Sequence, residues 1–139
     1  MLCVDDNHDF ADLLRMVIDG EPGLRCAGCL YSADELEAEL ESIQPQVVLL
    51  DATMPGKNPL HALRDLQARF RGTRMIVCSG YDDSAFVNRV LNTGAWGCVS
   101  KQDEPKDIIK AVREVAAGRP YFPSLSGDAS KTTPGNLDV

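Results

Sequence analysis

The sequence lacks any apolar run that approaches the roughly 20 residues needed to cross a bilayer. Its amino-terminal end also lacks the basic stretch followed by apolar residues that marks a secretion signal. We therefore expect a cytoplasmic protein with no membrane segment. Lysine and arginine form no basic block, and the net charge is -7, so we expect no direct binding to nucleic acid by these residues.

Cysteine is present five times, an odd number that, without an export signal, favours reduced thiols. Cys26 and Cys29 form a Cys-x-x-Cys pair, but it falls in a predicted strand rather than at the amino terminus of a helix. A zinc site would need a second pair, and the two histidines, His8 and His61, are isolated in the sequence. We interpret the cysteines as small apolar residues and assign neither histidine a role.

Strand-like and helix-like segments alternate along the first 118 residues. The segment 47–50, Val-Val-Leu-Leu, is too short for a helix and does not alternate, which is typical of a strand buried on both faces. Strands alternating with helices predict a parallel sheet covered on both sides. The expected strands are 2–4, 24–30, 47–50, 75–78 and 97–100, and the expected helices include residues 10–18, 32–43, 60–70, 82–92 and 105–116.

Two helices carry more specific signals. Ser32 and Glu35 have the spacing of a capping box at the start of the second helix. The first helix has apolar residues at helical spacing, which predicts that all of them face the core: Phe10, Leu13, Leu14, Val17 and Ile18.

The end of the chain has a different composition. Residues 119–139 are rich in proline, glycine, serine and threonine and show no periodicity. We assign residues 1–118 to one folded domain and residues 119–139 to a flexible tail or linker. Within that tail, Tyr121 and Phe122 are candidates to pack back onto the last helix.

Polar residues follow four of the five predicted strands. Because the strand ends of a parallel sheet meet at one edge, where α/β proteins bind ligands, we expect these side chains to converge. Each also has an ordinary interpretation: an aspartate can cap a helix, a serine can belong to a turn, and a lysine can be solvated. The residues are Asp5, Asp6, Asp51, Ser79 and Lys101.

The combination of residue types favours phosphoryl chemistry. Several carboxylates brought together repel one another unless a cation joins them, and an all-oxygen site suits Mg²⁺. An aspartate can act as a nucleophile and form an acyl phosphate. A lysine and a hydroxyl can bind the phosphoryl oxygens. The sequence therefore predicts that Asp51 accepts a phosphoryl group beside a magnesium ion.

At these positions the chain resembles the receiver domains of response regulators in two-component signalling. The resemblance covers residues 1 to about 118. The run from Lys101 to Pro105 and the Ala-Ala-Gly end of the last helix resemble the NarL/FixJ branch. The motifs that match are Asp5-Asp6, Asp51 to Gly56, Ser79-Gly80, and Gly94 to Gly97 leading to Lys101. The resemblance implies a flavodoxin-like (βα)5 fold with strand order 2-1-3-4-5.

The resemblance also implies a role for each residue. Asp51 would accept a phosphoryl group from a histidine kinase or a histidine phosphotransfer protein. Asp6, Asp51 and the main-chain carbonyl of Thr53 would bind Mg²⁺ directly, and Asp5 would act through water. Lys101 and Ser79 would bind the phosphoryl oxygens. The phosphorylated state would then change contacts with a partner, with a second copy of the chain or with an output domain.

The sequence departs from this family at several positions. Cys98 stands three residues before the lysine, where the family usually has a tyrosine or phenylalanine that moves on activation. Gln102 replaces the common proline after the lysine. Thr53 and Tyr81 occupy variable positions that tune the lifetime of the phosphorylated state, and a bulky Tyr81 would shield the acyl phosphate from water.

Three functions compete on these residues. The first is a phosphoacceptor module whose only enzymatic steps are self-phosphorylation and slow self-dephosphorylation. In the NarL-type branch, such a module is usually followed by a helix-turn-helix DNA-binding domain that regulates transcription. The second is a pseudo-receiver that is never phosphorylated, which Cys98 favours and the intact acidic set disfavours. The third is a haloacid-dehalogenase-type phosphatase, which would need an aspartate where Thr53 stands.

Overall fold

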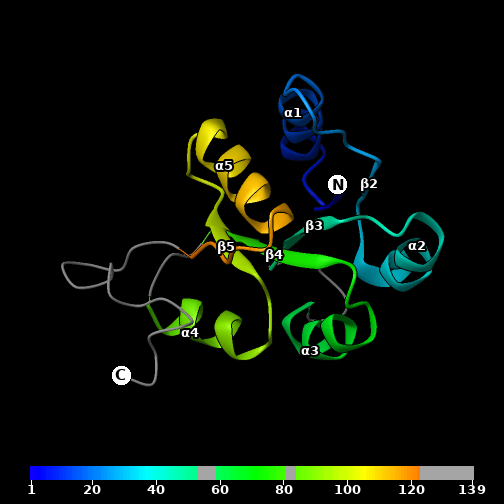
Figure 1. Ribbon diagram of the computed structural model, residues 1–139, viewed down its shortest axis with the longest axis vertical. Helices are drawn as coiled ribbons and strands as arrows, with labels where there is room; N and C mark the ends of the chain where they lie inside the picture. Colours follow the sequence, from blue (N-terminus) through cyan, green and yellow to red (C-terminus); the bar gives the residue numbers. More distant parts are fainter. Residues whose placement is uncertain (53–58, 81–83, 123–139) are drawn as a thin grey trace.

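The computed structural model describes residues 1–52, 59–80 and 84–122 of the chain. Its five strands form one parallel sheet in the order β2-β1-β3-β4-β5, which confirms the predicted order (Figure 1). The central strand β3 is buried at every position, as expected for a strand with helices on both sides. The strands are β1 (Leu2–Val4), β2 (Gly28–Leu30), β3 (Val47–Asp51), β4 (Arg74–Ser79) and β5 (Gly97–Ser100).

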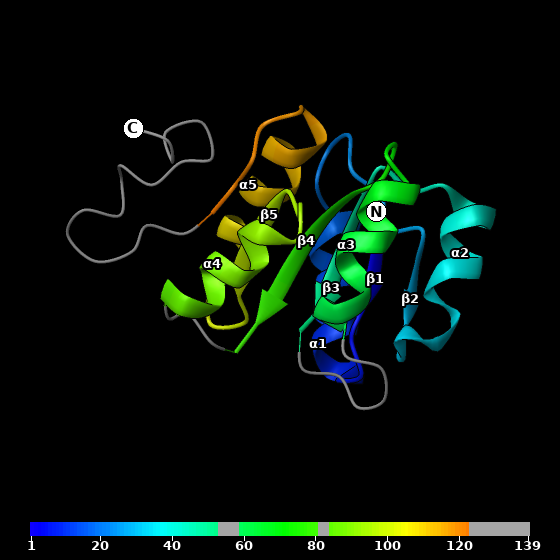
Figure 2. The same ribbon diagram turned by 90° about the horizontal axis from the view of Figure 1, so that it is seen from below.

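Helices connect the strands and cover both faces of the sheet. In Figures 1 and 2, α1 and α5 lie on one face and α3 and α4 lie on the other, with α2 beside α3. The helices are α1 (His8–Asp19), α2 (Leu36–Ile43) after a short 3-10 turn at Ala33–Glu35, α3 (Pro59–Arg69), α4 (Ser84–Asn92) and α5 (Pro105–Ala116). No helix in the described ranges combines the length and the apolar character needed to cross a membrane.

The core divides into two apolar layers, one on each face of the sheet. Alternate residues of β3 point to opposite sides: Val48 and Leu50 pack with α2, α3 and α4, whereas Val47 and Leu49 pack with α1 and α5. This alternation is the ordinary pleat of a strand. It explains why the Val-Val-Leu-Leu run carries no polar residue until it reaches the carboxyl edge of the sheet.

The structure corrects three local predictions. Leu13 is 47% exposed, because the buried face of α1 is formed by Ala11, Leu14 and Ile18, and Leu13 projects from the helix away from that face. The second strand is limited to Gly28–Leu30 rather than 24–30. Ser32 does not form the predicted capping box: its side chain accepts a hydrogen bond from the N–H of Asp34 and caps the 3-10 turn, and α2 begins only at Leu36.

The segment after α5 returns to the sheet. Tyr121 forms a parallel bridge with Gly97 of β5, and the main-chain N–H of Cys98 donates to the Tyr121 carbonyl at 2.9 Å. The packing that the structure describes therefore continues to Phe122, four residues beyond the domain boundary predicted at 118. Residues 123–139 of the predicted tail lie outside the described residues.

Candidate functional site

Main-chain hydrogen bonds of the sheet fix the positions of the predicted site residues. The N–H of Asp5 donates to Leu30 of β2 at 2.9 Å, so the ladder continues one residue past β1. The N–H of Lys101 donates to the Ser79 carbonyl at 2.8 Å, which ties the ends of β4 and β5 together. Asp51 is the last residue of β3 and pairs with Cys78 in register. All of these residues therefore converge at the carboxyl edge of the sheet, as predicted.

Lys101 joins two buried carboxylates at this edge. Its Nζ atom lies 2.9 Å from Asp5 Oδ2 and 3.3 Å from Asp51 Oδ2. Asp5 is 2% exposed and Asp51 is 1% exposed, whereas the Lys101 side chain keeps 23% of its surface in solvent. The ammonium therefore balances charge that has little access to water, and Lys101 is not simply a solvated surface lysine.

An aromatic ring that the sequence did not single out also contacts this lysine. Lys101 Nζ lies 5.1 Å from the centre of the Phe10 ring, within the range of a cation–π interaction. Phe10 belongs to the first turn of α1, the helix that begins shortly after the acidic pair. In the sequence it was only one member of an apolar stripe, and no local pattern connects it with a lysine 91 positions later.

The first helix is capped by Asn7 rather than by the acidic pair. The Asn7 side chain accepts a hydrogen bond from the N–H of Phe10 at 3.1 Å, and the Asn7 N–H donates to Asp5 Oδ1 at 2.8 Å. The ordinary interpretation of Asp5 and Asp6 as helix caps is therefore wrong. One oxygen of Asp5 is held by the main chain, and the other faces Lys101.

Three carboxylates lie close enough to share one cation. Asp5, Asp6 and Asp51 each offer an oxygen, and these oxygens all lie within 4.8 Å of one another. Asp6 is exposed, so the cluster opens to solvent on that side. Oxygen ligands with room for water suit Mg²⁺, and the residues present therefore fit the predicted metal. Thr53, the predicted main-chain ligand, lies outside the described residues.

The site perturbs the ionisation of two of its groups. Burial raises the pKa of Asp5, even though hydrogen bonds from Asn7 and Lys101 favour its charged form. Burial disfavours the charged form of Lys101, but its hydrogen bond to Asp5 and the two carboxylate charges outweigh this and raise the Lys101 pKa. At neutral pH the lysine is therefore the fixed positive charge of the site.

The hydroxyl and the switch position predicted from the sequence are both buried. Ser79 is fully buried at the end of β4, beside Ser100 of β5, and is not an exposed turn residue. Cys98 is 2% exposed within the apolar layer on the α4 side, near the middle of β5. Burial raises the pKa of Cys98 to about 12, so its thiol stays neutral. Tyr81 lies outside the described residues.

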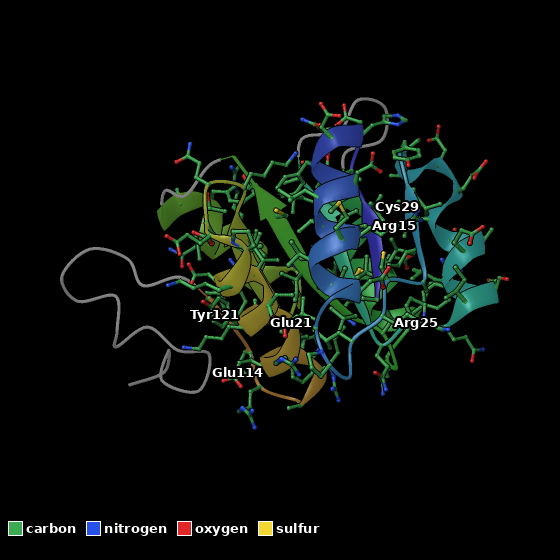
Figure 3. The ribbon with its side chains drawn as sticks, turned by 90° about the horizontal axis from the view of Figure 1, so that it is seen from above. Arg15, Glu21, Arg25, Cys29, Glu114 and Tyr121 are labelled. Carbon is green, nitrogen blue, oxygen red and sulfur yellow. The ribbon has the colours of Figure 1, made fainter. Side chains whose placement is uncertain are left out.

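The Cys-x-x-Cys pair is not part of the carboxylate cluster. Cys29 lies against α1 next to Arg15, as Figure 3 shows, and its thiol donates weakly to the Ala11 carbonyl at 3.9 Å. Cys26 donates to the Gly28 carbonyl at 3.4 Å. Burial raises the pKa of Cys29 despite the nearby Arg15 charge. Within the described ranges, the only cluster with the geometry of a metal site is the carboxylate group.

Comparison with known proteins gives one consistent result. A family model described as the response regulator receiver domain matches residues 1–113. The transcriptional regulatory protein DegU of Brevibacillus brevis is 31% identical over 122 residues, which cover 88% of this chain and 52% of DegU. The nitrate/nitrite response regulator protein NarL of Escherichia coli K12 is 30% identical over 118 residues, 85% of this chain and 55% of NarL. The chain thus spans about half the length of these relatives.

Solved structures of similar proteins share the fold. A two-component response regulator of the LuxR family from Aurantimonas sp. SI85-9A1 has a TM-score of 0.81 at 26% identity, covering 93% of this chain and 90% of that one. The isolated REC domain of RcsB from Salmonella enterica serovar Typhimurium, solved with the phosphomimetic BeF3-, has a TM-score of 0.80 at 22% identity, covering 88% and 91%. At 22% identity the second match shows the fold alone.

Proposed function

The chain belongs to the family of response-regulator receiver domains, and from this premise we propose that it is a phosphoacceptor module in which Asp51 takes up the phosphoryl group. The observation that carries the proposal is the position of Asp51. It is a buried carboxylate at the sheet edge, 3.3 Å from a lysine and part of a cluster of three acids. Nucleophile, countercharge and metal ligands therefore lie within one small volume.

The proposed reaction is transfer from a phosphohistidine. An Asp51 carboxylate oxygen attacks phosphorus, the new O–P bond forms as the N–P bond of the donor breaks, and the imidazole leaves. After the transfer, the Lys101 ammonium moves from the Asp51 carboxylate to the phosphoryl oxygens. The Ser79 hydroxyl donates a hydrogen bond to one of these oxygens. Self-phosphorylation and slow hydrolysis of the acyl phosphate are the only enzymatic steps in this proposal.

A divalent cation fits the same cluster. Asp6 and Asp51 would hold Mg²⁺ directly, and Asp5 would contribute through water, because both of its oxygens are already engaged by Asn7 and Lys101. When bound, the ion would neutralise charge that develops on the transferring group. Asp6 suits direct ligation because its side chain is exposed and faces the solvent side of the cluster.

The partners follow from the same proposal. A sensor histidine kinase or a histidine phosphotransfer protein would supply the phosphoryl group. The output would be transcription regulation through a helix-turn-helix domain that is not among these residues, with dimerisation as one route. The similarity to DegU, named a transcriptional regulatory protein, supports this output.

The direct test is phosphorylation with a small donor. The protein is incubated with acetyl phosphate and Mg²⁺, and intact mass spectrometry measures the added phosphoryl group. We expect one group on the wild type, none on Asp51→Asn, and an unchanged yield on Asp9→Asn, which alters an exposed aspartate of the first turn of α1. Binding of beryllofluoride with Mg²⁺ is measured in parallel by NMR.

The outcome separates the remaining alternatives. If neither acetyl phosphate nor beryllofluoride modifies or perturbs the folded wild type, the proposal is wrong and the chain is a pseudo-receiver that acts only by binding partners. Rapid turnover of a phosphate ester would instead indicate a phosphatase. A modification that persists in Asp51→Asn would place the phosphoryl group on another residue.

A further inference from the structure

A cavity of about 220 Å³ lies between α2 and α3, the two helices that lie side by side in Figure 1. Its floor consists of core residues, because Leu36, Leu50 and Leu66 all belong to the apolar layer on this face of the sheet. Ala33 and Ala62 line the cavity as well, and both are half-buried. The small alanine side chains leave the space between the helices unfilled, so apolar surface stays accessible there.

The size of this cavity suits one large apolar side chain. A closed apolar cavity of about 150 Å³ already accepts benzene, whereas sites that enclose a whole small-molecule ligand measure about 300–1,000 Å³. The cavity between α2 and α3 therefore has room for a phenylalanine or leucine side chain, but it is smaller than a site built to surround a metabolite. Its size favours a side chain that projects from a larger molecule.

Three exposed carboxylates line the same cavity. They belong to Asp34 in the 3-10 turn, Glu37 on α2 and Asp65 on α3. Arg69 pairs with Glu37 and, at 3.3 Å, with Asp65, so these positions already accept a guanidinium from the chain itself. Among the residues that the structure describes, Asp34 has no ion-pair partner. One arginine against three acids leaves the rim of the cavity with a net negative charge.

The acidic character continues along α2. Five of the twelve residues from 32 to 43 are aspartate or glutamate, and the sequence has no lysine or arginine between positions 26 and 56. A surface of one sign attracts partners of the opposite sign and repels those of its own. Nucleic acid, anionic lipid and a second copy of this chain, whose net charge is -7, are therefore poorly suited to it. A positively charged protein segment is well suited.

We propose that the cavity between α2 and α3 is the docking site for a basic segment of a partner protein. One large apolar side chain of the segment enters the cavity, and flanking lysines or arginines pair with Asp34, Glu37 and Asp65. Burial of the apolar side chain supplies most of the affinity, and the acidic rim selects the sign of the partner. The proposal is separate from the function of Asp51, because no residue of the candidate site lines the cavity.

A short peptide stands in for the unidentified partner in the test. The end-blocked peptide Lys-Lys-Phe-Lys-Lys is titrated into the full chain, and NMR follows the methyl groups of Leu36 and Leu66 and the amide of Asp34. We expect these signals to shift, with a Kd at least about tenfold lower than that of Lys-Lys-Ala-Lys-Lys, which cannot fill the cavity. Equal affinity of the two peptides overturns the proposal, because charge alone would then explain binding. Shifts centred on Asp6 and Lys101 instead also overturn it.

Two pairs of variants separate the cavity from the charge. Ala62→Leu fills the cavity without changing charge and should remove the advantage of the phenylalanine peptide, whereas Ala38→Leu, at an exposed position of α2 outside the cavity, should retain it. Asp34→Asn keeps the cavity open and should weaken binding by up to about fivefold. Its control, Glu41→Gln, removes an exposed charge of α2 that does not line the cavity and should weaken binding less.

Urea denaturation verifies that each variant folds. Full binding by folded Ala62→Leu overturns the proposal. Equal losses for Asp34→Asn and Glu41→Gln overturn it as well, and this second comparison stands even if Ala62→Leu does not fold.

Other occupants of the cavity give different results. Phenethylammonium carries the ring and one charge without a peptide; if it binds as tightly as Lys-Lys-Phe-Lys-Lys, the cavity is a small-molecule site. If the cavity signals shift with protein concentration alone and sedimentation shows a dimer, the occupant is a second copy of the chain. Either result overturns the assignment to a partner protein. Asp51→Asn should bind the peptide as the wild type does, so failure of the phosphorylation tests would leave the docking proposal in place.

Discussion

Lys101 Nζ lies 3.3 Å from Asp51 Oδ2, although Asp51 ends β3 and Lys101 follows β5, two strands that are separated by β4. The contact spans the carboxyl edge of the sheet, so it forms only when β3, β4 and β5 are in register. Asp51 is almost fully buried, and this ammonium places a positive charge directly beside its carboxylate. The ion pair between Lys101 and Asp51 thus contributes to the stability of the fold and also holds the ammonium beside the proposed phosphoacceptor.

Replacing Lys101 by methionine should destabilise the metal-free protein. Met keeps the apolar stem but removes the ammonium that pairs with both Asp5 and Asp51. We expect a loss of about 3 kcal/mol in the free energy of unfolding at pH 7, at the low end for a broken buried pair because Lys101 is partly exposed. Urea denaturation measures it. Mg²⁺ should recover more stability in the variant than in the wild type, because a bound cation takes over the countercharge.

The control for this variant is Lys106→Met. Lys106 pairs with Glu104 at 3.3 Å, but both side chains are exposed, at 78% and 68%. Such surface pairs contribute about 0–1 kcal/mol. Equal losses for the two variants, or the same Mg²⁺ response in both, would show that Lys101 does not compensate buried charge.

Asp5 should make the protein less stable as the pH rises. Burial raises its pKa in the folded state, so the folded protein binds a proton that the unfolded chain has already released. Stability from this group is therefore full below the unfolded pKa of 3.8 and is lost as the pH rises through the higher folded pKa. We expect Asp5→Asn, which does not titrate, to gain stability relative to the wild type across that window and to stay level above it.

Urea denaturation without Mg²⁺, repeated from acid to neutral pH, checks this prediction. Asp12→Asn, an exposed position on α1, serves as the comparison and should follow the wild type. A difference between Asp5→Asn and wild type that shrinks with rising pH would mean that Lys101 and Asn7 stabilise the Asp5 charge more than burial opposes it.

Phe10→Leu should weaken the hold on Lys101 while preserving the core. Leucine keeps the apolar contact of α1 but lacks the ring whose centre lies 5.1 Å from Nζ. A cation–π interaction of this kind is worth about 0.5–1 kcal/mol. We therefore expect a lower Lys101 pKa, measured by NMR titration of the lysine side chain. Phe86→Leu is the control, because its ring faces Arg89 on α4 and not the site. An unchanged Lys101 pKa in Phe10→Leu would contradict this role.

The sheet and the converging site residues were predictable because both depend on chain direction and register. The order of strands and the polar residues after 4, 50, 78 and 100 place Asp5, Asp51, Ser79 and Lys101 at one edge. Because the topology brings the carboxylates of Asp5 and Asp51 together at a buried edge, a positive charge was expected beside them. No side-chain detail was needed for this step, since parallel strands end at the same edge whatever packs on their faces.

Contacts between residues distant in the sequence were not predictable in this way. The Phe10 ring and the Lys101 ammonium meet only in the folded chain, and neither has a local signal of the other. Leu13 fitted the apolar spacing of α1, yet the face that lies against the sheet is formed by Ala11, Leu14 and Ile18. Tyr121 packs against the layer that contains α5, as expected, but its main-chain bridge to β5 had no signal in the sequence, because it depends on the missing side chain of Gly97.

The buried thiols provide a final prediction. Burial raises the pKa of both Cys78 and Cys98 to about 12, whereas an unfolded thiol has a pKa of about 8.5. Only the thiolate reacts with iodoacetamide, so at pH 8 these two cysteines should be alkylated at least 100-fold more slowly in the folded protein than in urea, by an order-of-magnitude estimate. Peptide mapping after timed labelling measures each cysteine separately. Cys26, which is only partly buried, gives an internal reference for reagent activity. Labelling of Cys98 at the rate seen in urea would mean that β5 opens readily in the folded protein, and would contradict its burial.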